Sequence, residues 1–228
     1  MKLAVLFSGG KDSSYALLKA LESEEHEVVC LVSLISQNKE SFMFHTPNIS
    51  MTKLQAEAIG LPLIEQETMG EKEKELLDLK IAIQRAREEH GVEGVVTGAI
   101  ESVYQASRVQ AICDELGLWC FNPLWKKDQE ELMRDLISRG FEVIISGVFA
   151  YPLNEGFLGR KLSEKLLDEL LVLEKKYRIS PSGEGGEIET TVLDAPFFRK
   201  KIKILDFEPV DTGGSWVFSI KDAGLVSR

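Results

Sequence analysis

Short apolar runs alternate with segments of helical periodicity over the first two thirds of the chain. The apolar runs have the length of buried strands and lie at 2–7, 27–34, 61–64, 94–97, 118–121 and 141–148. Between them, apolar residues recur at helical spacing in 51–59, 71–90, 102–116 and 129–139. Because strands that alternate with helices form βαβ units, this order predicts an α/β fold with a doubly wound parallel sheet.

The pattern changes after residue 148. Residues 151–156 carry a proline and a glycine, as linkers do, and a leucine-striped helix is expected over 163–177. Short strands are expected near 189–193, 201–207 and 215–220. We therefore expect two domains, an α/β domain over residues 1–150 and a smaller α+β domain over residues 151–228.

Composition and charge narrow the class of protein. Of the 228 residues, 44% are hydrophobic and 28% charged, which is ordinary for a folded globular protein. A formal charge of -10 opposes binding to nucleic acid or to anionic membranes. No apolar run approaches the roughly 20 residues of a spanning helix. Three cysteines without a C-x-x-C pair favour a reducing compartment, so we expect a cytoplasmic protein.

The clearest chemical signal is the string FSGGKDSS at residues 7–14. It combines a strand exit, paired glycines and the start of a helix, where unpaired backbone N–H groups and the helix dipole favour an anion. Gly9 and Gly10 leave room for phosphate oxygens, and Ser8, Lys11 and Ser13 add donors. The alternative is that Asp12 or Ser13 merely caps the helix after a tight turn.

Two common phosphate-binding motifs do not fit this string. A Walker A loop needs a glycine at position 5, where Val5 lies, and a Rossmann turn needs more glycines after Gly10. The string instead resembles the PP-loop, Ser-Gly-Gly-x-Asp-Ser, of the ATP pyrophosphatase group of α/β nucleotide-binding proteins. Members of that group cleave ATP between the α and β phosphates. The resemblance implies that the first domain binds ATP.

Four later segments extend the resemblance over most of the chain. They are residues 33–45, 98–109, 123–125 and 183–190, the last with the sequence GEGGEIET. Together they are similar to the diphthine–ammonia ligase family, in its short, archaeal form. The resemblance implies ATP-dependent amidation of the diphthine carboxylate on elongation factor 2 by ammonium. The expected route is an acyl-adenylate, with diphthamide, AMP and pyrophosphate as products.

The resemblance also implies roles for residues of the first domain. The loop N–H groups, with Ser8, Lys11 and Ser13, would hold the leaving pyrophosphate, and Asp12 would orient Mg²⁺. Gly98 follows a parallel strand, where open α/β sheets bind ligands, and would let the chain approach the nucleotide. Ser33, at the end of the second strand, would offer backbone contacts to adenine. His45 lies in a long connection that would cover the nucleotide.

Three carboxylates, Glu184, Glu187 and Glu189, cluster around paired glycines in the second domain. From the residues alone, an acidic surface hairpin is the simpler interpretation. With the resemblance, the cluster becomes a loop that presents the trimethylammonium of diphthine and the ammonium ion, with Glu184 and Glu187 as its catalytic members.

Two other functions remain open at this point. A PP-loop enzyme that modifies RNA would need a basic groove and reactive cysteines, whereas Cys30 and Cys113 lie inside a predicted strand and helix. An ATP-binding regulatory module without turnover would have no need of the acidic segment. We expect neither a nucleic acid nor a membrane partner. The sequence leaves open whether the chain forms a homo-oligomer.

Overall fold

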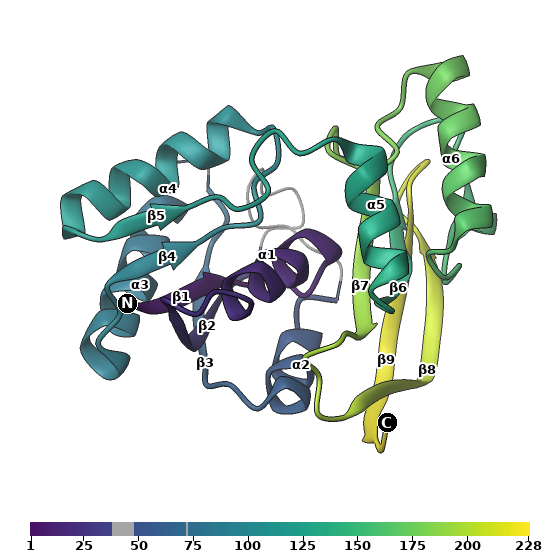
Figure 1. Ribbon diagram of the computed structural model, residues 1–228. Coiled ribbons are helices and arrows are strands. Elements are labelled where there is room, and N and C mark those ends of the chain that lie inside the picture. Colours follow the sequence, from purple (N-terminus) through teal and green to yellow (C-terminus); the bar gives the residue numbers. More distant parts are fainter. Residues whose placement is uncertain (38–47, 72) are drawn as a thin grey trace.

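The computed structural model describes residues 1–37, 48–71 and 73–228 (Figure 1). Part of the segment 33–45, including His45, therefore lies outside the described residues. Within the described part of the chain, no helix has both the length and the apolar character needed to span a bilayer.

The first half of the chain forms a parallel sheet of five strands, as predicted. The spatial order is β3-β2-β1-β4-β5, with bounds β1 (Lys2–Leu6), β2 (Glu27–Ser36), β3 (Leu63–Thr68), β4 (Gly94–Val96) and β5 (Trp119–Phe121). Four helices connect the strands: α1 (Lys11–Leu21), α2 (Met51–Ile59), α3 (Glu75–His90) and α4 (Val103–Leu116).

Helices cover both faces of this sheet, which makes it doubly wound (Figure 1). Leu3 and Val5 of β1 pack in one cluster with residues of α1 and α2, whereas Ala4 packs in another with α3 and α4. Successive side chains of a strand point to opposite faces, so an uninterrupted apolar run such as β1 indicates a strand buried on both sides. The α/β fold class predicted from the sequence is confirmed.

The second half forms an antiparallel sheet of four strands in the order β7-β6-β9-β8. Its strands are β6 (Glu142–Val148), β7 (Ile188–Asp194), β8 (Lys201–Asp211) and β9 (Trp216–Val226). Helices α5 (Gln129–Ser138) and α6 (Glu164–Tyr177) and a short 3-10 turn, η1 (Glu155–Phe157), complete this half.

The strand at 141–148 was expected in the parallel sheet, and that expectation is wrong. β6 pairs antiparallel with β7 and β9. All but the first of its residues are buried, and such a run has the same appearance in a parallel sheet as in the middle of an antiparallel one. The second sheet thus begins before the boundary expected near residue 150, and the division into 1–150 and 151–228 stays a prediction.

The second sheet docks on the phosphate loop through β7. The Val192 N–H donates to the carbonyl of Gly9 at 3.0 Å. Gln55, a buried residue of α2, donates from Nε2 to the carbonyls of Gly9 at 2.9 Å and Val192 at 2.8 Å. One amide therefore ties the loop, helix α2 and strand β7 together.

Replacing this amide tests the junction. We expect Gln55→Leu to lower the free energy of unfolding by about 1–3 kcal/mol, because a buried carbonyl loses its donor. Lys53→Ala, on the exposed side of the same helix, should change it by less than about 1 kcal/mol. Urea denaturation of both variants measures the difference, and equal stabilities would contradict the role given to Gln55.

Candidate functional site

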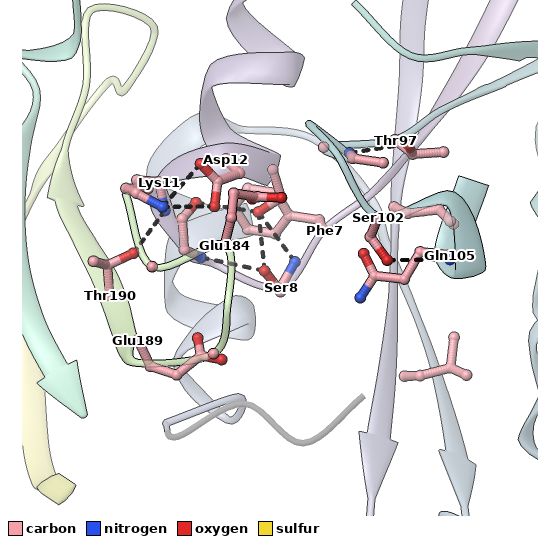
Figure 2. Close-up of a pocket in the computed structure, with 18 of the residues that line it drawn as sticks. Phe7, Ser8, Lys11, Asp12, Thr97, Ser102, Gln105, Glu184, Glu189 and Thr190 are labelled. Atoms are coloured by element: carbon pink, nitrogen blue, oxygen red, sulfur yellow. Dashed lines mark hydrogen bonds and ion pairs between the residues drawn. The ribbon is translucent and has the colours of Figure 1, made fainter. Parts of the chain in front are cut away.

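A cavity of about 400 Å³ lies where the two sheets meet. Its walls come from the carboxyl ends of β1, β2 and β4, the first turns of α1 and α4, and residues 183–190 (Figure 2). Open α/β sheets bind ligands at the carboxyl ends of their strands, and the volume lies in the range of small-molecule sites. The cavity is therefore the candidate active site.

The phosphate loop forms one end of the cavity. Five residues of the predicted set line it: Ser8, Gly10, Lys11, Asp12 and Ser13. Helix α1 begins at Lys11 and has Gly10 at its N-cap, without a side-chain capping bond, so neither Asp12 nor Ser13 caps it. Thr190 of β7 accepts the Lys11 N–H through Oγ1 at 3.1 Å. Apart from this bond the helix N-terminus has no side-chain cap of its own, and such an end beside a cavity suits an anion.

The charged side chains of the loop hold each other. Lys11 is only 3% exposed, and its Nζ lies 3.0 and 2.8 Å from the two carboxylate oxygens of Asp12. Mg²⁺ is commonly held by one or two carboxylates together with substrate phosphates. The partly exposed Asp12 fits that pattern, and no cluster of three metal-ligating side chains occurs among the described residues.

Gly98 permits a close contact between the end of β4 and the phosphate loop. A Cβ atom there would lie 2.8 Å from the Ser13 nitrogen and 2.9 Å from the Asp12 carbonyl carbon. The end of β4 therefore presses against the first turn of α1, and Gly98 also lines the cavity. Only glycine permits this approach.

Two residues expected to touch the nucleotide do not line the cavity. Gly9 has φ of +78°, and a Cβ there would lie 2.2 Å from Oε1 of Gln55. The hydroxyl of Ser33 donates to the Phe7 carbonyl at 2.5 Å. The structure gives both residues a part in shaping the loop, while their predicted contacts to the nucleotide stay untested.

The wall behind the loop is apolar, and most of its residues were given no role from the sequence. It consists of Leu6, Val32, Leu34, Leu79, Ala99 and Val109, with the polar Ser102 and Gln105 beside them. A flat apolar slot with a few polar groups is suited to a nucleobase. In the sequence these residues have the pattern of ordinary core positions, so no local signal distinguishes them.

Two of the three clustered carboxylates reach the cavity. Glu184 and Glu189 line it, and Figure 2 draws Glu184 beside the phosphate loop and Glu189 below it. Glu187 does not line it, because its Oε1 accepts the Ser180 N–H at 2.9 Å. Its other oxygen is buried without a partner among the described residues. Glu187 therefore helps to shape the loop from behind.

A glutamine of α5 anchors the acidic loop. Oε1 of Gln129 accepts from the hydroxyls of Ser180 at 2.5 Å and Ser182 at 2.8 Å. Ser180 Oγ in turn accepts the N–H of Glu184 at 2.9 Å. Gln129, like Gln55 and Thr190, was missed because its partners lie far away in the sequence.

Burial alters the acidity of both cavity carboxylates. The pKa of Glu189 is raised to about 7, chiefly by burial; nearby Lys11 opposes this rise and Asp12 adds to it. The pKa of Glu184 is also raised, by burial and then by Asp12. Near neutral pH, Glu189 can therefore both accept and release a proton.

The cysteines lie away from the cavity. Burial raises the pKa of Cys30 to about 12, and a hydrogen bond with Cys120 together with burial raises that of Cys113. The structure brings Cys113 and Cys120 together although their spacing forms no motif. No cysteine among the described residues lines the cavity.

Family models match both halves of the chain. The diphthamide synthase N-terminal domain matches residues 1–120, and the diphthamide synthase C-terminal domain matches residues 128–226.

Similar whole proteins carry one name. The diphthine–ammonia ligase of Schizosaccharomyces pombe is 38% identical over 237 residues, which cover 97% of this chain and 39% of that protein. Those of Rattus norvegicus and Homo sapiens are 37% and 35% identical over 229 residues, with 92% of this chain and 85% of each relative covered.

Two solved structures are distant neighbours. One is described as a predicted subunit of tRNA methyltransferase from Methanocaldococcus jannaschii, with a TM-score of 0.44, 18% identity, and coverage of 86% of this chain and 98% of that one. The other is the U34-tRNA thiolase NcsA of Methanococcus maripaludis, with a TM-score of 0.40, 17% identity, and coverage of 82% and 70%.

The raised pKa of Glu189 makes a prediction about stability. A folded-state pKa above the unfolded value gives stability that is present below about pH 4.5 and lost as the pH rises through about 7. Glu189→Gln should therefore be about as stable as the unmodified protein at pH 4, and more stable at pH 8 by up to about 3 kcal/mol. Urea denaturation at both pH values measures this.

An exposed glutamate of the same sheet provides the control. Glu208→Gln removes a carboxylate of β8 whose ion-pair partner among the described residues is Lys221 at the surface, so its effect should be small at either pH. If Glu189→Gln changed stability equally at pH 4 and pH 8, Glu189 would not titrate as described.

Proposed function

The chain belongs to the diphthamide synthase family, and on that premise we propose that it amidates the diphthine carboxylate of elongation factor 2 with ammonium at the expense of ATP. The reaction passes through an acyl-adenylate and releases AMP and pyrophosphate. One observation carries the proposal: a helix N-terminus without a side-chain cap of its own and two carboxylates line one cavity. Such a cavity offers a site for a polyphosphate and, beside it, carboxylates that attract cations.

The phosphate end stabilises the leaving group. The N–H groups of the first turn of α1, with Ser8, Lys11 and Ser13, bind the β and γ phosphates, where negative charge builds up as the bond to the α phosphate breaks. Lys11 Nζ is already held at this end by Asp12. A preorganised cation there stabilises the transition state without further rearrangement.

Asp12 is the proposed carboxylate for Mg²⁺, directly or through water, with phosphate oxygens supplying most of the remaining ligands. The metal would neutralise phosphate charge and orient the chain of phosphates. The apolar slot formed by Leu34 and Val109 holds adenine, with Gln105 beside it.

The acidic wall receives the positively charged substrates. Diphthine carries a trimethylammonium group and the nitrogen donor is ammonium; Glu184 is the carboxylate that attracts the trimethylammonium, and Glu189 the one that attracts ammonium. Glu184 is fixed by the Glu101 N–H, which donates to its Oε2 at 3.2 Å. A carboxylate held in this way can position a cation.

Product analysis tests the function. The purified chain is incubated with ATP, Mg²⁺, ammonium and diphthine-bearing elongation factor 2, and diphthamide is detected by mass spectrometry. We expect AMP and pyrophosphate to form in step with diphthamide. ADP and phosphate would contradict the proposal; turnover with tRNA in place of the factor would favour an RNA-modifying enzyme; and absence of any turnover would favour a regulatory module.

Variants of the phosphate loop should lose turnover. Lys11→Ala and Asp12→Ala each remove a charge at the leaving group, and we expect a loss on the order of 10²-fold or more in rate. Lys19→Ala, at the far end of the same helix, is the matched control and should keep its rate. Circular dichroism checks folding; near-normal rates in both loop variants would refute the loop assignment.

The acidic loop should affect amidation and spare ATP binding. Glu184→Gln keeps the size of a side chain that lines the cavity but removes its charge, so amidation should fall on the order of tenfold while ATP affinity changes little. Calorimetry and the amidation rate measure the two effects. Glu187→Gln should have the smaller effect, because Gln can still accept the Ser180 N–H. If amidation were unchanged in the double variant that combines Glu184→Gln with Glu187→Gln, the loop would be a solvated hairpin.

A further inference from the structure

Glu189 is a cavity carboxylate without a partner. It lies on the rigid strand β7, where its register neighbour on β6 is Gly147, a residue without a side chain to pair with it. No described residue forms a hydrogen bond or an ion pair with its carboxylate, in contrast to Glu184 and Glu187, whose oxygens accept backbone N–H groups. Glu189 is therefore the carboxylate of the cavity that remains free to accept a proton.

We propose that Glu189 is the base that takes the proton from ammonium. The inference rests on the proposed function, in which ammonium must become ammonia before it can attack, since the charged ion has no lone pair.

The proposed step begins with a proton transfer to Glu189 and ends with the release of AMP. The carboxylate of Glu189 accepts one proton from ammonium, and the ammonia released there attacks the carbonyl carbon of the acyl-adenylate. The bond between that carbon and the phosphate oxygen breaks, and AMP leaves with the electron pair. The nitrogen loses a second proton to solvent as the amide forms. Glu189 then releases the proton that it took from ammonium to solvent.

The surroundings of Glu189 suit this task. Its pKa near 7 leaves a large ionised fraction at neutral pH, yet makes it a far better base than an ordinary carboxylate. The charged groups of the described residues that act on it are Lys11 and Asp12 of α1, with opposite effects, and β6 contributes only Gly147. Lys11, which is paired with Asp12, lowers the pKa of Glu189 by less than burial raises it.

The test compares two nitrogen nucleophiles. Hydroxylamine is largely uncharged at neutral pH and needs no base to free its lone pair, whereas ammonium does. For Glu189→Gln we expect amidation by ammonium to fall on the order of 10²-fold or more, and hydroxamate formation to stay near the rate of the unmodified protein. Diphthine-dependent exchange of pyrophosphate into ATP, which reports the adenylation step alone, should also persist.

Controls separate chemistry from folding. Glu208→Gln should react normally with both nucleophiles, and melting curves check that each variant folds. Glu189→Asp, which keeps a carboxylate, should retain more activity with ammonium than Glu189→Gln does. In the unmodified protein, the rate at saturating ammonium should rise as the pH passes about 7, and Glu189→Gln should lose this rise beyond the part due to free ammonia.

The outcomes are distinct. Equal losses with ammonium and hydroxylamine, or an unchanged rate with ammonium, would overturn the role of Glu189 while leaving the proposed function in place. Absence of pyrophosphate exchange in the unmodified protein would instead contradict the proposed function, and this inference with it.

Discussion

The start of helix α1 has no side-chain cap of its own, and the site depends on how that end is completed. Strand β7 supplies the completion: Thr190 accepts the Lys11 N–H, and Val192 donates to Gly9. The rest of the first turn of α1, with Asp12 and Ser13, lines the cavity. Because β7 also carries Glu189 and follows the loop with Glu184, the contact that fixes the phosphate loop also positions the carboxylates beside it.

This arrangement provides separate positions for two substrates of opposite charge, the phosphates of ATP and the cationic amine. The positive end of a helix and Lys11 attract the phosphates, while Glu184 and Glu189, which line the same cavity, attract a cationic amine. Burial raises the free energy of the ionised form of Glu189. The free energy of unfolding is therefore lower above neutral pH, and this loss of stability accompanies a base placed in the cavity. Function and stability thus oppose each other at this residue, as often happens in active sites.

Local signals in the sequence were sufficient for the elements and the phosphate loop, because strand, paired glycines and helix are neighbours in the chain. They were insufficient for β6, whose buried run does not reveal its sheet. The sequence also led us to name Glu187, and not Glu189, as a catalytic member beside Glu184, whereas β7 begins only at Ile188 and Glu187 does not line the cavity. Gln55 and Thr190 act through partners far along the chain, which no local pattern reveals.

In the proposed reaction, one oxygen of the diphthine carboxylate attacks the α phosphate of the ATP bound in this cavity. This step is tested most directly by labelling the diphthine carboxylate of elongation factor 2 with heavy oxygen and following the label by mass spectrometry. An acyl-adenylate requires one labelled oxygen to appear in AMP and the other to remain in the amide. Unlabelled AMP, or label in inorganic phosphate released with ADP, would contradict the account.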